Sequence, residues 1–149
     1  IIADCSAGIE PLYGIHLVRT VMDGMALSSL HPAFVRHAEK HGLALPSLQR
    51  ELEQSASIQH LTRLPTSLRQ LFITAHDVSP SHHVRMQAAF QRHSDSGVSK
   101  TINLPPSATP QDVAEAVQLA HRLGCKGLTV FRSGSRRDQV LSCSQQQSC

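Results

Sequence analysis

In the second half of the chain, the spacing of apolar residues changes from that of a strand to that of a helix and then back to that of a strand. A short β-prone run at residues 99–104 is followed by a helical repeat, and a second β-prone run covers residues 128–131. Thr109 is the expected N-cap of the helix, and Gly124 is expected to end it. The helical repeat places apolar side chains at i, i+3, i+4 and i+7, namely Val113, Ala116, Val117 and Ala120. This order predicts a strand–helix–strand unit of a parallel sheet, and therefore an α/β fold class.

The N-terminal part predicts a β-hairpin. Residues 12–22 are rich in aliphatic and β-branched side chains, and they are followed by the turn dipeptide Asp23-Gly24. Residues 25–27 then begin the expected return strand.

Two helices and a linker are expected after the hairpin. The first helix begins at His31-Pro32 and ends at Gly42, and the second covers residues 47–54 behind a proline. Residues 55–62 are mostly polar and are the best candidate for a linker. The apolar side chains expected on the first helix are Phe34, Val35 and Ala38.

Two more helices precede the strand at residue 99. A short one follows Pro65, and a longer one begins at Ser79-Pro80, where serine is the N-cap and proline lies in the first turn. The short helix contains Leu68, Leu71 and Phe72. On the longer helix, the i, i+3, i+4 spacing predicts a buried face made of Met86, Ala89 and Phe90.

Composition limits the classes of protein that need to be considered. The chain has 149 residues, of which 40% are hydrophobic and 17% charged, as in an ordinary globular domain. It contains no apolar run long enough to cross a membrane and no secretory signal. The formal net charge of +3 and the 3% aromatic content do not suggest nucleic-acid binding. The chain begins inside an apolar segment without an initiator methionine, so we expect upstream sequence to be missing.

The cysteines and histidines do not form a metal motif. The four cysteines match no structural zinc spacing, and we expect reduced thiols in a cytoplasmic setting. His37 and His41 are one helical turn apart, but no third ligand is evident, so exposed helix histidines explain them better. The neighbours His82 and His83 point to different sides of a helix. Asp77 could pair with the adjacent histidine, although local turn hydrogen bonds are the better explanation.

Lys100 is the most informative charged residue. A lysine in a strand that looks buried needs a carboxylate or an anion. We expect a structural ion pair with Glu10 or Asp95, and the alternative is direct contact with a ligand. No nucleophile motif, glycine-rich phosphate loop or paired-carboxylate signature is complete. The residues alone therefore predict an α/β fragment without a self-sufficient active site.

Several segments, in the same order, resemble the adenosylcobalamin-dependent class II ribonucleotide reductases. The first, Gly8-Ile9-Glu10-Pro11 with its flanking residues from 5, resembles ribonucleotide reductase large chains in general. The second covers residues 74–80 and 83–91 and resembles class II in particular. The others are residues 98–105, which read VSKTINLP, and residues 124–136, which contain GCKGLTVFR. His93 and Ser94 depart from the family, which usually has an aromatic and an aliphatic residue there.

The resemblance implies a fold and a reaction. It implies that residues 1–141 are the C-terminal part of a ten-stranded α/β barrel, incomplete here, with a disordered Ser/Gln/Cys tail at residues 142–149. The implied reaction makes deoxyribonucleotides for DNA synthesis from ribonucleoside di- or triphosphates. Cobalamin homolysis generates a thiyl radical, and the sugar 2′-hydroxyl is replaced by hydrogen. The implied partners are the ribonucleotide, a thioredoxin-type reductant and the remainder of the reductase chain.

The resemblance also implies where the site residues lie. The radical cysteine is expected upstream of Ile1, so we expect no catalytic residue in this chain and no activity of the chain alone. Ile1, Ile2 and Ser6 are expected next to the substrate phosphates. The candidates for the barrel interior are Glu10, Lys100, Asn103 and Thr129. A possible redox tail carries Cys143 and Cys149, although a frayed chain end explains these two equally well.

Two further points bear on function. Thr129 and Val130 occupy positions where the iron-dependent class has a radical-relaying tyrosine pair, which agrees with a cofactor bound directly to the large chain. The alternative function is a non-catalytic remnant that binds a nucleotide or a protein through the loop at residues 132–137. That loop carries Arg132, Arg136 and Arg137, and it could equally be a solvated loop.

Overall fold

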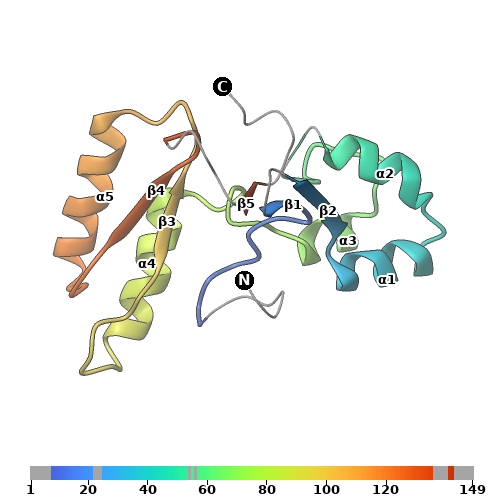
Figure 1. The fold of residues 1–149 in the computed structure, drawn as a ribbon. Coiled ribbons are helices and arrows are strands. Elements are labelled where there is room, and N and C mark those ends of the chain that lie inside the picture. The colour runs from blue at the N-terminus through green and yellow to red at the C-terminus, as the bar shows by residue number, and fades with distance from the viewer. Residues whose placement is uncertain (1–7, 22–24, 54, 56, 136–140, 143–149) are drawn as a thin grey trace.

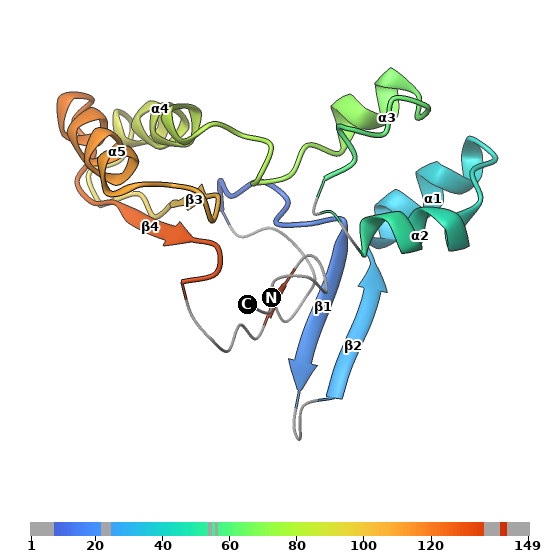
Figure 2. The same ribbon diagram turned by 90° about the horizontal axis from the view of Figure 1, so that it is seen from above.

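The helices and strands form two units that lie apart and are connected by extended segments (Figures 1 and 2). The computed structural model describes residues 8–21, 25–53, 55, 57–135 and 141–142. We call the first group of elements the hairpin unit: β1 (His16–Val21), β2 (Met25–Leu30), α1 (Pro32–Lys40), α2 (Leu45–Leu52) and α3 (Thr66–Leu71). We call the second group the sheet unit: α4 (Pro80–Gln91), β3 (Thr101–Leu104), α5 (Pro110–Arg122) and β4 (Thr129–Arg132).

The predicted hairpin is confirmed. β1 and β2 pair antiparallel, from His16 opposite Leu30 to Val21 opposite Met25. The predicted turn at Asp23-Gly24 lies outside the described residues. A short strand, β5 (Leu141–Ser142), pairs with the other edge of β1, which makes a three-stranded sheet in the order β2-β1-β5. Ser142, expected to begin the tail, therefore belongs to a sheet.

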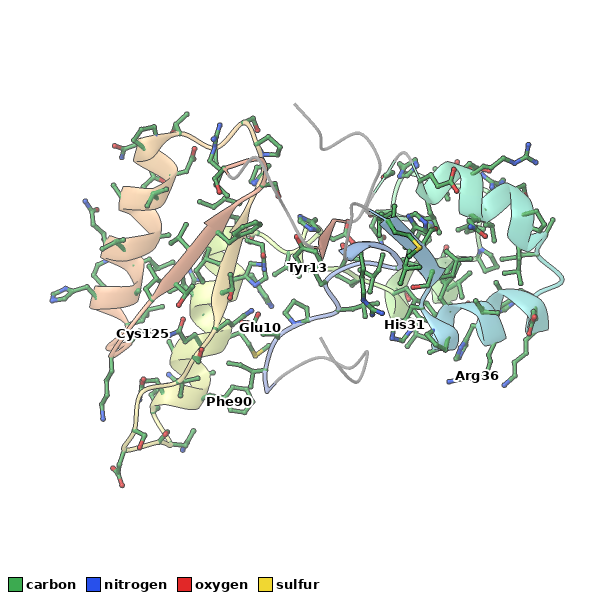
Figure 3. The ribbon with its side chains drawn as sticks, in the orientation of Figure 1. Glu10, Tyr13, His31, Arg36, Phe90 and Cys125 are labelled. Carbon is green, nitrogen blue, oxygen red and sulfur yellow. The ribbon has the colours of Figure 1, made fainter. Side chains whose placement is uncertain are left out.

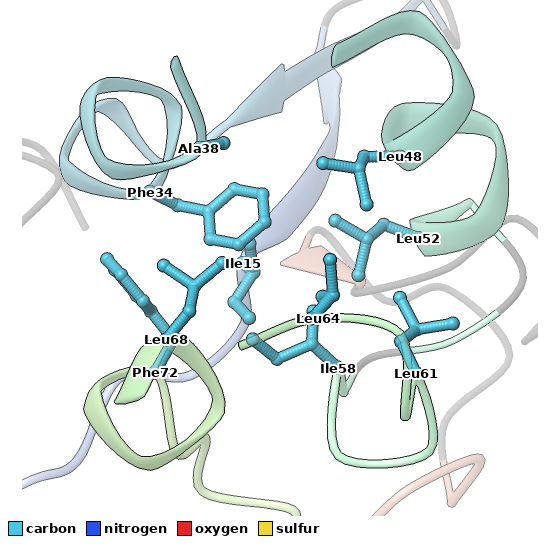
Figure 4. Close-up of a cluster of buried hydrophobic side chains, with 10 residues drawn as sticks. All are labelled: Ile15, Phe34, Ala38, Leu48, Leu52, Ile58, Leu61, Leu64, Leu68 and Phe72. Carbon is cyan, nitrogen blue, oxygen red and sulfur yellow. The ribbon is translucent and has the colours of Figure 1, made fainter. Parts of the chain in front are cut away.

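The hairpin unit is held together by an aliphatic core to which all three of its helices contribute (Figure 4). His31 caps α1, as its Nδ1 accepts a hydrogen bond from the backbone N–H of Ala33 at 3.3 Å. Gly42 follows the helix with φ of +66°, the left-handed conformation expected at a helix end. The buried side chains are Ile15, Phe34, Ala38, Leu48, Leu52, Ile58, Leu61, Leu64, Leu68 and Phe72.

The prediction that residues 55–62 form a linker is wrong. Ile58 is fully buried and Leu61 is 8% exposed, so both belong to this core. The polar side chains around them fix the backbone instead of leaving it solvated. The hydroxyl of Ser57 accepts from the N–H of Gln59 at 3.0 Å, and the Gln59 amide donates to the carbonyl of Arg69 at 2.8 Å. The segment is therefore a packed turn between α2 and α3.

The strand–helix–strand prediction is confirmed in the sheet unit. β3 and β4 pair in parallel, with Thr101 opposite Thr129 and Asn103 opposite Phe131. α5 begins with a reciprocal capping box between Thr109 and Asp112. The hydrogen bonds from the N–H and hydroxyl of Thr109 hold the pKa of the Asp112 carboxyl below its usual value.

The apolar stripe of α5 is narrower than predicted. Ala116 and Ala120 are buried against the sheet, whereas Val117 is 49% exposed. Among the described residues, only the side of α5 that faces α4 and the sheet is covered, so Val117 falls outside the contact.

The predicted buried face of α4 is wrong. Met86 and Phe90 are 40% and 49% exposed, and Ala89 is half-buried. The buried face is instead His83, Val84, Gln87, Ala88 and Gln91. Polar residues can occupy it because loop backbone groups reach them, as described below. His93 is exposed and Ser94 half-buried with a hydroxyl bond to the Ser96 carbonyl, so neither weakens a core.

In the part of the chain that the structure describes, no helix combines the length and apolar character needed to cross a membrane.

Candidate functional site

A buried ion pair links the N-terminal segment to the beginning of β3. The Nζ of Lys100 lies 2.9 Å from Oε2 of Glu10, and the other carboxylate oxygen accepts the backbone N–H of Thr101. The Lys100 side chain is 2% exposed and that of Glu10 is 26% exposed. The prediction of a structural ion pair is thus confirmed with Glu10. The alternative partner Asp95 does not pair with Lys100; its backbone carbonyl accepts a hydrogen bond from Lys126.

His83 lies beside this ion pair on α4. Its Nε2 donates to the carbonyl of Ala75 at 3.0 Å, and the ring is fully buried. Burial lowers the pKa of His83, and the charge of Lys100 lowers it further, while the Ala75 carbonyl and the Glu10 carboxylate act in the opposite direction. The ring is therefore neutral at pH 7, and its Nδ1 is a buried acceptor with no partner among the described residues.

Asn103 and Thr129 lie on the face of the two-stranded sheet that carries no helix. Ile102 and Leu104 point toward α4 and α5, since both belong to the core beneath those helices. Side chains alternate along a strand, so Asn103 and its neighbours two positions away face the opposite side. Asn103 is 8% exposed, whereas Thr129 is exposed. Lys100 is two residues before Ile102 and therefore points to the same side as Ile102. The structure does not bring Lys100 to the helix-free face.

Glu10, on the N-terminal segment, lies next to the sheet unit, whereas Tyr13 lies between the two units (Figure 3). The ring of Tyr13 meets that of His76 edge-on, with centroids 5.2 Å apart. The pKa of His76 is lowered by burial, against the opposing effect of the Asp77 carboxylate. Asp77 accepts hydrogen bonds from the N–H and hydroxyl of Thr74 at 2.8 and 2.9 Å, which confirms the predicted local turn.

The other sequence candidates have structural partners. His37 bonds through Nδ1 to the carbonyl of Ala33 at 2.8 Å and packs edge-on against Phe72. The described residues contain no group of three or more side chains suited to a metal ion. Arg132 donates to the carbonyls of Pro106 and Ala108, so its guanidinium joins the end of β4 to the loop between β3 and α5.

Two glutamines that the sequence did not single out organise the loops before β3 and β4. Gln91 donates to the carbonyls of Ser94 and Ser96 at 3.0 and 2.8 Å and accepts the N–H groups of Val98 and Lys126. Gln87 donates to the carbonyls of Val98 and Gly127 at 2.9 and 2.8 Å. The one sequence signal for them is the four-residue spacing of His83, Gln87 and Gln91, which places three polar side chains on one helix face.

Several predicted site residues lie outside the described part of the chain. These are the phosphate-adjacent candidates Ile1, Ile2 and Ser6, the loop residues Arg136 and Arg137, and the tail residues Cys143 and Cys149.

A family comparison identifies this arrangement. Residues 1–131, which include both strands of the parallel sheet almost to the end of β4, match the family model described as the barrel domain of ribonucleotide reductase. The chain belongs to the ribonucleotide reductase barrel-domain family. The resemblance inferred from the sequence is therefore confirmed.

Individual relatives of this reductase domain carry more specific names. The chain is 40% identical, over 95% of its length, to a vitamin B12-dependent ribonucleoside-diphosphate reductase of Thermoplasma acidophilum. It is 42% identical over the same share to the enzyme of that name from Mycobacterium tuberculosis. These matches cover 18% and 20% of the relatives, so the chain spans about a fifth of their length.

A solved reductase structure supports the fold. The alpha subunit of a class Id ribonucleotide reductase from Actinobacillus ureae superposes with a TM-score of 0.69. The superposition covers 99% of this chain and 25% of that subunit, at 19% sequence identity. The chain is thus a reductase barrel-domain fragment of mixed helices and strands.

Proposed function

We propose that this chain is part of the catalytic subunit of a cobalamin-dependent ribonucleotide reductase, which makes deoxyribonucleotides for DNA synthesis. The observation that carries the proposal is the 40% identity across 95% of the chain to a reductase named as vitamin B12-dependent. The name of that relative favours a ribonucleoside diphosphate as substrate. A thioredoxin-type dithiol, the remaining reductase chain and a cytoplasmic location belong to the same proposal.

In this proposal β3 and β4 are strands of the ten-stranded barrel of the family, which residues 1–141 complete only in part. Two observations support it. The strands are parallel, and both α4 and α5 pack on the same face through the second core. In an α/β barrel the helices lie outside, so the helix-free face with Asn103 and Thr129 would face the interior.

The chemistry is assigned to residues elsewhere in the reductase. We propose that Ile1, Ile2 and Ser6 lie next to the substrate phosphates, and that the radical cysteine belongs to another part of the barrel. Cys143 and Cys149 are proposed as carriers of reducing equivalents. Glu10 and Lys100 are assigned to holding the N-terminal segment against β3, because each satisfies the other's charge.

The described residues do not make a cobalamin site by themselves. Buried polar atoms without a partner among them include His16 Nδ1, His83 Nδ1, Gln87 Oε1 and Ser133 Oγ. His83 and Gln87 both lie on α4, whereas His16 belongs to β1 and Ser133 follows β4, so these atoms do not all come from one element. The proposal of a cobalamin cofactor rests on the names of the relatives.

A chimera tests the proposal. The matching stretch of the Thermoplasma acidophilum enzyme is replaced by this chain, and deoxyribonucleotide formation is measured with adenosylcobalamin, a dithiol and a ribonucleoside diphosphate. We expect activity within about tenfold of the parent, with KM for the nucleotide preserved. A soluble, folded chimera that makes no product would contradict the proposal.

The isolated chain provides the complementary test. Under the same conditions we expect it to form no deoxyribonucleotide, and any product would show that it contains its own catalytic groups. The rival function, a remnant that binds nucleotide through residues 132–137, predicts saturable binding of a ribonucleotide by this chain in isothermal titration calorimetry.

A further inference from the structure

The two units have separate apolar cores. The core of the hairpin unit runs from Ile15 to Phe72, and that of the sheet unit is centred on Val84, Ile102 and Leu104. The two cores share no residue. Among the described residues, the extensive contacts between helices and strands also lie within one unit or the other. Apolar packing therefore does not hold the units together.

The connections between the units are polar. We call them the joint, which consists of residues 10–14, residues 73–79 and the beginning of β3 at Lys100 and Thr101. Within it, the N–H of Ala75 donates to the carbonyl of Leu12 at 2.7 Å, and the carbonyl of Ala75 accepts from His83 of α4 at 3.0 Å. The Glu10–Lys100 ion pair and the Thr101 N–H bond to Glu10 also belong to the joint.

The two partners of the ion pair differ in their access to water. Water reaches Glu10, whose side chain is 26% exposed, but hardly reaches Lys100, at 2%. A buried ammonium that loses its carboxylate must find another acceptor or move into water. Moving Lys100 would displace the beginning of β3 from residues 10–14, and with it the contact between the units.

We propose that the Glu10–Lys100 pair is a latch that closes the joint, and that its release opens the joint while each unit stays folded. The closed state is the one in the structure. In the open state the Lys100 ammonium leaves the carboxylate, and the hairpin unit turns relative to the sheet unit about residues 73–79. Each unit has its own core and stays intact, so the two units can move as rigid bodies between the closed and the open arrangement.

Amide hydrogen exchange of the full chain distinguishes the latch from a general loss of stability. The decisive reporter is the N–H of Ala75, which belongs to the joint but is not bonded to either charged residue. In Glu10→Gln, we expect its exchange rate to rise about tenfold or more, because Lys100 is left buried and unpaired. Amides inside α1 and α5 should stay within about twofold of the wild-type rates.

Matched variants complete the test. Glu51→Gln breaks the exposed ion pair with Arg63 and should leave Ala75 unchanged. Glu10→Gln combined with Lys100→Met removes both charges and should return the Ala75 rate to within about threefold of wild type, and it can be measured even if the single variant does not fold. The proposal is overturned if the exchange rate of the Ala75 amide does not rise in Glu10→Gln, or if the amides of α1 and α5 exchange faster by the same factor. It is also overturned if the Ala75 amide of the double variant exchanges about tenfold or more faster than in the wild type.

Discussion

Gln91 is the residue whose replacement tests most directly how the sheet unit is held together. It is 6% exposed, and it makes four hydrogen bonds to the backbone of the loops that precede β3 and β4. Gln91→Leu keeps a side chain of similar size on α4 but removes all four. We therefore expect a folded sheet unit with loosened loops.

The magnitude follows from the environment of the four partners. A net hydrogen bond contributes about 0.5–1.5 kcal/mol, and a buried group left without a partner costs about 1–3 kcal/mol. Ser96 and Lys126 are exposed and can regain water, whereas Ser94 and Val98 are half-buried. We expect Gln91→Leu to lower the free energy of unfolding by about 2–4 kcal/mol.

Urea unfolding followed by far-ultraviolet circular dichroism measures this loss, with the slope against urea compared between variants. Gln111→Leu is the matched control, because Gln111 is exposed and bonds only to Glu115 on the surface of α5. The control should change stability by less than about 0.5 kcal/mol. A Gln91→Leu variant as stable as this control would refute the role given to the glutamine.

Three further predictions concern the first core, the buried histidine and a helix cap. Ile58→Ala should lower the free energy of unfolding, measured in urea, by about 2–4 kcal/mol, because Ile58 is fully buried. The control Leu71→Ala should have little effect, because the Leu71 side chain is 59% exposed. Equal effects of the two variants would contradict the packed turn. Because burial puts the pKa of His83 below the unfolded value of about 6.5, the unfolded chain binds the proton first as the pH falls. The contribution of His83 to stability should thus be full above about pH 6.5 and decline below it by up to about 1.4 kcal/mol per pH unit. His83→Asn should flatten this decline when urea unfolding is compared at about pH 7.5 and 5.5. An unchanged dependence on pH would show that other groups cause the decline. Thr109→Ala should cost about 1 kcal/mol and speed amide exchange in the first turn of α5, and unchanged exchange there would argue against the cap.

Short-range signals in the sequence were sufficient for most of the secondary structure. Thr109 and Ser79 cap helices through groups three residues away, so their role can be predicted from neighbouring letters. The same holds for the parallel strand pair, because the helix and the glycine between its strands are encoded in one stretch. The hairpin was predicted from a turn dipeptide between two β-prone runs.

Long-range partners explain what the sequence did not predict. The sequence did not single out Gln87, because one of its acceptors, the carbonyl of Gly127, is 40 residues away. Met86 and Phe90 fit a helical apolar period, but no described element covers them. The burial of Ile58 was not predicted because its sequence neighbours are polar. The side chains of those neighbours bind backbone groups. Lys100 was predicted to need a carboxylate, yet only the folded chain distinguishes Glu10 from Asp95.

The position of β1 has a consequence for how the protein is made. β1 is the central strand of its sheet, with β2 on one edge and β5 on the other. β2 is synthesised directly after β1, but β5 is synthesised only after nearly all the other described residues. Throughout translation, one flank of β1 thus presents unsatisfied amides and carbonyls to any extended peptide nearby. A nascent chain that stalls before residue 141 should depend more on chaperones than one in which β5 has been synthesised.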